Sequence, residues 1–334
     1  MPPLRRNAVA WGALAALGIA APFLVYPVFA MKILCLALFA CAFNLLLGYT
    51  GLLSFGHAAF LGTAGYVTGH TVKVLGFQPE IGILAGTAAA AALGYVIGSL
   101  AIRRSGIYFA MITLALAQML YFMFLQMPFT GGEDGLQGVP RGKLFGAVDL
   151  MQPLYMYYFV FTIFLAGFWL VYRTVHSPFG QVLKAIRENE PRAISLGYDV
   201  EKYKLTAFVL SAALSGLAGA TKSLVFQLAS LTDVHWHTSG EVVLMTLLGG
   251  MGTVFGPVVG AIVVVGIQNY GANIGEWVIV ITGTIFVICV LAFRRGIVGE
   301  IAALMKEVSP AAAEGGGPDQ PGPRKPASRT PGVT

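Results

Sequence analysis

The chain has 334 residues, of which 57% are hydrophobic and only 11% are charged, and its formal net charge is +6. A soluble domain carries roughly a quarter charged residues, so this composition excludes an ordinary soluble protein and predicts an all-α polytopic membrane protein. The positive charge does not indicate nucleic acid binding, because the basic residues are spread between apolar runs. Cys35, Cys41 and Cys289 sit inside apolar runs and are predicted to be packing residues.

Six predicted spans lie in the first half of the chain. Residues 1–7 precede an apolar run that we interpret as an uncleaved first span, because it is long and a second run follows at once; a signal peptide is the alternative. The predicted spans are about 8–26, 31–47, a Gly-rich run that ends near 75, 81–102, 107–127 and 154–172.

Four further apolar runs follow a long charged interval. They cover about 205–220, 241–248, 254–270 and 276–293, and the second is too short to span a bilayer alone. We therefore expect about ten transmembrane helices in one membrane domain, residues 8–308. A count of eight, with two Gly-rich segments re-entrant, is the alternative. Residues 309–334 hold six Pro and five Gly and are predicted to be disordered.

The distribution of basic residues predicts the orientation. With ten crossings and a cytoplasmic N-terminus, sixteen of the 21 Lys and Arg residues fall on the cytoplasmic side and five on the other. Membrane proteins carry such an excess on their cytoplasmic loops. Both termini and the charged interval are therefore predicted to be cytoplasmic.

Residues 174–204, called the charged loop below, are the longest strongly charged interval between apolar runs. Apolar residues among Lys and Arg over Gln181–Arg187 suit a short amphipathic helix. A second helix is predicted over Glu190–Leu196, with Asn189 as N-cap, Pro191 in the first turn and Gly197 at its end. A docking loop for a separate soluble protein and an ordinary solvated loop are both compatible with this pattern.

Two Gly-rich segments, Gly48–Gly56 and Gly249–Pro257, interrupt the predicted spans. Irregular backbone at bilayer depth is tolerated only where it is buried in protein or lines a wet cavity. The similar patterns GLLSFG and GTVFGP are consistent with an internal duplication, and close helix packing is the alternative to a pathway role. The resulting pathway or hinge candidates are Gly51, Ser54, Gly56, Gly249, Gly250, Gly252 and Gly256.

Glu241 and His57 are the polar candidates close to these breaks. A carboxylate that enters an apolar segment is a functional candidate, but Thr238 and Glu241 also fit a Thr-x-x-Glu capping box, which we favour. For His57 a packing role is favoured over a gate or proton carrier. His235 and His237 lack a third ligand, so no metal site is predicted. The cations expected to extend to the membrane interface are Lys32, Lys73 and Lys222.

Catalytic motifs are absent from the sequence. It contains no G-x-x-x-x-G-K-[ST] loop, so the chain is not expected to bind ATP through a P-loop, and it shows no nucleophile–base pair, zinc motif or dinucleotide fingerprint. The sequence therefore predicts a protein that is not an enzyme and holds no cofactor of its own.

Four stretches, spread over about residues 40–295, resemble the LivM-type permease subunit of branched-chain amino acid ABC importers. They are NLLLGYTGLLSFGHAAFLGTAGY, TGGEDGLQGVPR, SPFGQVLKAIRENEPRAISLGYDVEKYKLTAFVLSA and LLGGMGTVFGPVVGA, in the family's order. The resemblance implies a type II ABC importer permease-like fold in a bacterial inner membrane, and a coupling helix in the charged loop. The family's Glu-Ala-Ala and Gly signature is echoed here, at a shifted spacing, by Glu190, Ala193 and Gly197. The resemblance implies that the residues coupled to the ATPase are Glu190, Pro191, Arg192, Ala193 and Gly197.

The resemblance also implies partners and a substrate. The partners would be membrane lipid, a second LivH-like permease, two cytoplasmic ATPases that hold ATP and Mg²⁺, and a periplasmic or extracellular substrate-binding protein. The substrate would be leucine, isoleucine or valine; urea, short amides and other amino acids are the alternatives within related permeases.

An ion-coupled secondary transporter is the rival from another class, although Glu241 is the one residue that suits ion coupling. A membrane scaffold that transports nothing is the third hypothesis.

Overall fold

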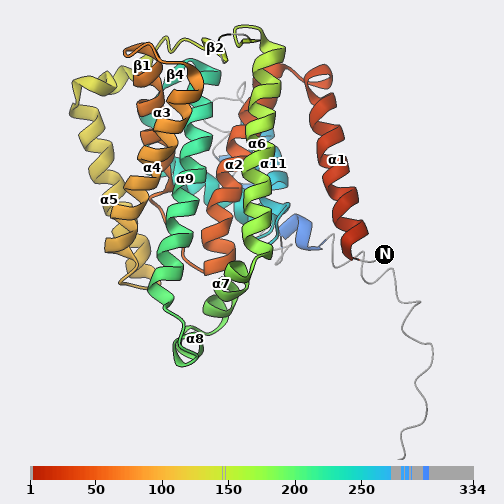
Figure 1. Ribbon diagram of the computed structural model, residues 1–334, viewed down its shortest axis with the longest axis vertical. Helices are drawn as coiled ribbons and strands as arrows, with labels where there is room; N and C mark the ends of the chain where they lie inside the picture. The colour runs from red at the N-terminus through yellow and green to blue at the C-terminus, as the bar shows by residue number, and fades with distance from the viewer. Residues whose placement is uncertain are drawn as a thin grey trace, which may run out of the picture.

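The computed structural model describes residues 3–144, 146, 148–271, 280–281, 283–285, 287 and 296–300. Within these residues, nine helices run between two ends of one bundle (Figure 1). They are α1 (Pro3–Leu24), α2 (Pro27–Thr50), α3 (His57–Lys73), α4 (Pro79–Ala101), α5 (Ile107–Gln126), α6 (Pro153–His176), α9 (Val200–Phe226), α10 (Trp236–Gly249) and α11 (Gly256–Gly271).

Five of these described helices, α2, α4, α5, α6 and α9, are long and apolar enough to cross a membrane. Two shorter apolar helices, Leu14–Leu24 within α1 and Gly256–Gly271, accompany them. The predicted all-α polytopic membrane protein is therefore confirmed. The predicted last span, 276–293, lies mostly outside the described residues, and the predicted disordered tail, 309–334, lies wholly outside them.

Short elements close the two ends of the bundle (Figure 1). At one, the α8 end, α7 (Pro178–Glu188) and α8 (Glu190–Ser195) connect α6 to α9. At the other, the strand end, two small antiparallel pairs form, Leu136–Gln137 (β1) with Leu228–Ala229 (β4) and Lys143–Leu144 (β2) with Val148–Asp149 (β3). The 3-10 turns at this end are η1 (Pro128–Thr130), η2 (Gly132–Asp134) and η3 (Leu231–Asp233).

Helix α2 forms the centre of the core. It is apolar on all sides, and a helix of this kind is stable only when other helices surround it. It packs against α6, α9, α10 and α11, and every side chain from Cys35 to Leu46 is buried. Cys35 and Cys41 are buried free thiols, in line with the predicted packing role, whereas Cys289 lies outside the described residues.

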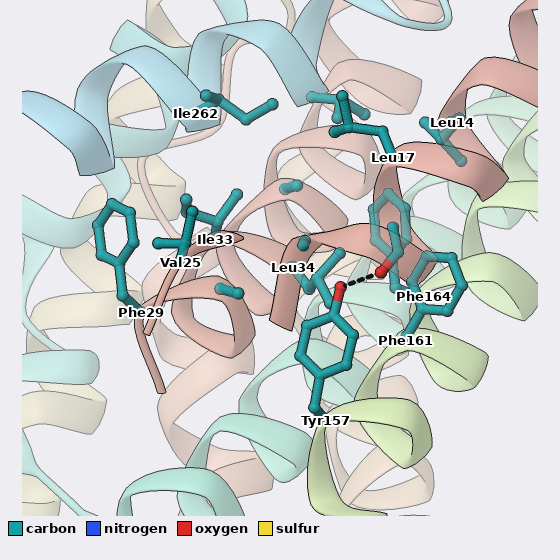
Figure 2. Close-up of a pocket in the computed structure, with 15 residues that line it drawn as sticks. Leu14, Leu17, Val25, Phe29, Ile33, Leu34, Tyr157, Phe161, Phe164 and Ile262 are labelled. Carbon is teal, nitrogen blue, oxygen red and sulfur yellow. Dashed lines mark hydrogen bonds between the residues drawn. The ribbon is translucent and has the colours of Figure 1, made fainter. Parts of the chain in front are cut away.

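Helix α1 packs beside this core and leaves an apolar cavity of about 260 Å³ (Figure 2). The cavity lies between α1, α2, α6 and α11 and is lined by side chains such as Leu17, Ile33, Phe161 and Ile262. The Tyr157 hydroxyl donates to the Gly18 carbonyl over 2.6 Å, so the one buried hydroxyl on this wall is satisfied by the α1 backbone.

Both predicted Gly-rich breaks are confirmed, with narrower bounds. The helix continues through Gly48 to Thr50, and the first break covers residues 51–56. The second break covers residues 250–255. Gly51 and Gly252 each adopt a left-handed conformation with φ 77°, which requires glycine at both turns.

Helices α10 and α11 form an antiparallel hairpin with the second break at its tip. A Cβ on Gly249 would overlap the Gly256 carbonyl oxygen, and one on Gly260 would overlap the Met245 carbonyl oxygen. Small residues therefore allow the two backbones to approach closely, so the proposed packing role holds for this hairpin.

We predict that Gly260→Ala destabilises the protein by about 1–3 kcal/mol, because the added methyl group overlaps the α10 backbone. The matched control is Gly266→Ala on the same helix, where a Cβ has open space and alanine favours the helix. Thermal unfolding in detergent should show a lower melting temperature for the first variant alone; equal melting temperatures would contradict the close packing described here.

Candidate functional site

The charged loop folds as the two short helices predicted for it. The Ser177 Oγ caps α7 by accepting from the Gly180 N–H at 3.3 Å, and the Asn189 Oδ1 caps α8 by accepting from the Arg192 N–H at 3.0 Å. The predicted Asn189 cap is therefore confirmed. Helix α7 begins at Pro178, earlier than predicted, because Ser177 rather than a later residue supplies the cap.

Gly197 ends α8 as predicted. It has φ 87°, its N–H donates to the Ile194 carbonyl, and the Tyr198 N–H donates to the Ala193 carbonyl. These two hydrogen bonds define a Schellman motif, which satisfies carbonyl groups that the helix itself leaves free. Pro191 lies in the first turn of α8, where its missing N–H costs nothing.

A small core fixes α8 to the neighbouring helices. Ala193 is buried against Ile186 of α7 and Val200 of α9. Glu190 Oε1 lies 2.6 Å from the Nζ of Lys204, whose side chain is only 7% exposed. A buried ammonium group requires a partner, so Glu190 also holds α8 on α9. Sequence reasoning missed this intramolecular role, since nothing in the spacing of the two residues signals it.

The start of α9 is stabilised by a second cap. The Asp199 Oδ1 accepts from the Lys202 N–H at 3.2 Å, and Oδ2 lies 2.7 Å from Lys202 Nζ. The hydrogen bond from the Lys202 side chain holds the pKa of the Asp199 carboxyl below its ordinary value. The Asp199 carboxylate thus caps the start of α9.

The outer surface of α8 and the turn after it is apolar. Ile194, Leu196 and Tyr198 are 58%, 68% and 41% exposed. These three residues are called the α8 patch below. Exposed apolar side chains gathered at a charged, protruding end of a protein are a candidate interaction surface. Arg192 is also exposed beside them, whereas Ala193 faces inward.

Arg187 of α7 connects the charged loop to both Gly-rich breaks. Its guanidinium donates to the Gly48 carbonyl at the end of α2. A Cβ built on Gly51 would lie 3.2 Å from its Cγ, and one on Gly252 would lie 3.3 Å from its Nη1. The structure thus brings Gly51 and Gly252 together around one side chain, beside a cavity of about 470 Å³ that Lys184 also lines.

Asn44 of α2 supplies the second connection. Its Oδ1 accepts from the Gly252 N–H at 3.0 Å, and its Nδ2 donates to the Thr253 carbonyl at 2.8 Å. A buried side-chain amide thus satisfies two backbone groups that the second break leaves without helical partners. We call Asn44, Gly48, Arg187 and Gly252 the junction below.

Ser54, Gly56 and His57 lie away from the junction, in a closed cluster. The buried Ser54 Oγ accepts from the Gly56 N–H at 3.2 Å. His57 Nε2 lies 2.8 Å from Ser211 Oγ, and its ring makes edge contacts with Phe43, among other aromatic rings. The surroundings of the fully buried His57 are those of a packing residue, the role favoured from sequence.

Glu241 does not form the predicted capping box. Helix α10 begins at Trp236, with His235 as its cap, and the Thr238 hydroxyl donates to the Thr232 carbonyl. Because α10 begins at Trp236, Thr238 lies inside the helix. The N–H groups that follow it are therefore not free for its side chain to cap. The Glu241 carboxylate instead accepts from Gln268 Nε2 of α11 at 3.0 Å.

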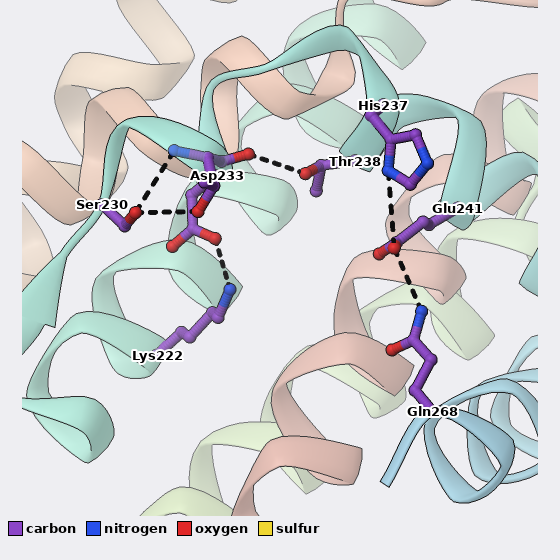
Figure 3. A network of polar contacts seen from close by, with 8 residues as sticks. Lys222, Ser230, Asp233, His237, Thr238, Glu241 and Gln268 are labelled. Carbon is purple, nitrogen blue, oxygen red and sulfur yellow. Dashed lines mark hydrogen bonds and ion pairs between the residues drawn. The ribbon is translucent and has the colours of Figure 1, made fainter. Parts of the chain in front are cut away.

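Glu241 lines a polar cavity of about 420 Å³ at the strand end, with Lys32, Lys222, Asp233 and Gln268. Figure 3 shows the contacts of Lys222 with Asp233 and of Glu241 with Gln268. Lys222 Nζ lies 2.5 Å from Asp233 Oδ1. Lys32 and Lys222 both line this cavity at the strand end, and their predicted extension to the membrane interface stays a prediction. The third cation of that group, Lys73, donates to the Gln137 carbonyl of β1 at 2.7 Å.

Sequence reasoning overlooked Asn44, Arg187 and Gln268 as site residues. The one available signal was Asn44, an amide inside an otherwise apolar span, because polar groups there require internal partners. Arg187 and Gln268 become informative only when the breaks and the hairpin are placed in space.

The bundle and the junction define a polytopic helical membrane protein in which two interrupted helices meet one helical loop. The chain belongs to the family described as the permease component of the branched-chain amino acid transport system, which matches residues 27–292. No solved structure matches the chain.

Three relatives carry names from the same transport system. The high-affinity branched-chain amino acid transport system permease protein LivM of Escherichia coli is 26% identical over 282 residues, covering 76% of this chain and 65% of that protein. A probable LivM permease protein of Methanocaldococcus jannaschii is 27% identical, covering 61% of each chain. A probable LivH permease protein of the same organism is 29% identical over 117 residues, covering 33% of this chain and 34% of that protein. The chain thus spans about two thirds of its LivM relatives.

We predict that Asn44→Ala destabilises the hairpin tip by about 1 kcal/mol or more, since it leaves the partly buried Gly252 N–H and Thr253 carbonyl without their side-chain partner. Asn269→Ala is the matched control, because Asn269 is exposed on α11. Limited proteolysis and melting temperature in detergent should separate the two variants. If both behave like the unmodified protein, the two hydrogen bonds do not hold the tip.

Proposed function

We propose that this chain is the permease subunit of a binding-protein-dependent ABC importer that moves branched-chain amino acids across the bacterial inner membrane. Membership of the permease family and the names of the LivM relatives support the substrate class. The observation that carries the mechanism is the contact of Arg187, on the charged loop, with both Gly-rich breaks. Two cytoplasmic ATPases hold ATP and Mg²⁺ in this proposal, and a LivH-like permease completes the pore.

The proposed orientation places the α8 end and both termini in the cytoplasm and the strand end outside. The excess of Lys and Arg on that side supports it. The same orientation leaves the strand end facing the substrate-binding protein and places the charged loop where a cytoplasmic ATPase can reach it.

In this proposal the α8 patch enters a groove of the ATPase, as a coupling helix. Ile194, Leu196 and Tyr198 supply the apolar contact, and exposed Arg192 supplies charge at its edge. Buried Ala193 and paired Glu190 keep α8 attached to α7 and α9, so that a push on α8 moves the whole charged loop. Pro191 and Gly197 set the two ends of this helix.

Arg187 then transmits the movement. Because α8 shares a core with α7, closure of the ATPases would displace Arg187, and its contacts would carry the end of α2 and the hairpin tip with it. The glycines at the breaks, Gly51, Gly250 and Gly252, have positive φ and can act as hinges. Movement there would change access to the pore from the two sides of the membrane in turn.

We predict that Ile194→Glu combined with Leu196→Glu prevents the ATPases from co-purifying with the permease, because the change places two charges on the apolar contact surface. Leu75→Glu, an equally exposed apolar position near the strand end, is the matched control and should retain the ATPases. Glu190 is unsuitable for this test, because its replacement also breaks the pair with Lys204. Normal ATPase recovery with the double variant would show that the α8 patch is not the docking surface.

We predict that Arg187→Met leaves the complex assembled but lowers the amount of leucine taken up per ATP hydrolysed by tenfold or more. The reason is that the side chain linking the charged loop to the breaks is lost. Arg103→Met, at an exposed arginine between α4 and α5, is the control. Uptake into proteoliposomes by the unmodified complex should require both ATP and the binding protein. Uptake driven by a proton or sodium gradient alone, or no uptake at all, would instead support the secondary transporter or the scaffold.

A further inference from the structure

The polar cavity at the strand end is built from four separate parts of the chain. Lys32 comes from α2, Lys222 from α9, Asp233 from η3, and Glu241 and Gln268 from the hairpin. Its volume of about 420 Å³ lies within the range of roughly 300–1,000 Å³ that is usual for small-molecule sites. Leu36 adds an apolar side chain to the lining of this cavity.

Two of the four charged groups are already paired. Lys222 and Asp233 lie 2.5 Å apart and neutralise each other. Figure 3 shows this pair on one side and Glu241 with Gln268 on the other. Within the described part of the chain, Lys32 has no carboxylate within 4.0 Å.

Glu241 keeps capacity for a further cation. A carboxylate offers about four lone-pair sites, and Glu241 accepts one hydrogen bond from Gln268. His237 Nδ1 lies 3.6 Å away, which is too long for a strong hydrogen bond. Among the described residues, the cavity therefore presents one cation with no carboxylate within 4.0 Å and one carboxylate that a neutral amide only partly satisfies.

We propose that this cavity binds the head group of a zwitterionic α-amino acid, with Lys32 facing its carboxylate and Glu241 facing its ammonium group. The proposal rests on the proposed function and extends it by naming a contact site in the permease itself. Charged groups in membrane segments are expensive unless paired, and a zwitterion would pair both at once. Urea or a short amide carries no charge and would leave both groups unpaired, so the cavity favours amino acids over those alternatives.

The first experiment measures uptake by the complete importer, with its binding protein and ATP, in proteoliposomes. Glu241→Gln and Lys32→Met should each lower the maximal rate of leucine uptake by about tenfold or more, the effect of losing a hydrogen bond to a charged group. The concentration of loaded binding protein that gives half the maximal rate should stay the same, because docking occurs outside the cavity. Asp149→Asn and Lys73→Met are the matched controls at the same end of the molecule, and they should behave like the unmodified complex.

The second experiment detects occupancy directly. Thr238→Cys places a thiol on the cavity wall, in a protein whose three natural cysteines are replaced by alanine. Leucine should slow its reaction with a methanethiosulfonate reagent. Leucinamide, which lacks the carboxylate, and 4-methylpentanoate, which lacks the ammonium group, should protect far less.

The outcomes separate this inference from the proposed function. If the unmodified complex imports leucine with ATP but Glu241→Gln and Lys32→Met import equally well, the cavity is not the site. Equal protection of the thiol by leucine, leucinamide and urea would likewise overturn the zwitterion assignment. If the unmodified complex imports nothing, the proposed function itself fails.

Discussion

The structure depends on the contacts that join two interrupted helices to the charged loop. Helix ends leave N–H and C=O groups without partners inside the helix, and side chains supply some of those partners here. Asn44 supplies them for the second break, and Arg187 supplies one for the end of α2. Because Arg187 belongs to α7, its side chain links the end of α2 to the charged loop.

Helix α2 connects the polar cavity at the strand end with the junction. It carries Lys32 at the polar cavity and Gly48 at the junction, sixteen residues apart and so about 24 Å along the helix. Its burial on all sides makes it a rigid connection rather than a flexible one. Under the proposed function, a displacement of the charged loop would therefore be transmitted to the strand end. It would pass through α2 and through the hairpin, which carries Glu241.

Patterns of local origin were predicted well from sequence. The apolar runs up to residue 271, both breaks, the Asn189 cap and the Gly197 helix end depend on neighbours within a few residues, and the structure contains each of them. The prediction of a capping box at Glu241 was wrong, because His235 caps α10 and the helix therefore begins earlier than predicted. Contacts over a long range, such as Arg187 with Gly48 or Glu190 with Lys204, leave no periodic signal in the sequence.

The central claim is that the charged loop and the hairpin tip move together. Spin labels on Ser195→Cys, on α8, and Met251→Cys, at the tip, can report this by pulsed distance measurements in the assembled importer, with Val96→Cys on α4 as the reference. On ATP binding, we predict that the distance from Met251 to Val96 changes while the distance from Ser195 to Met251 stays constant. A tip that remains fixed relative to α4 while α8 moves away from it would contradict the account.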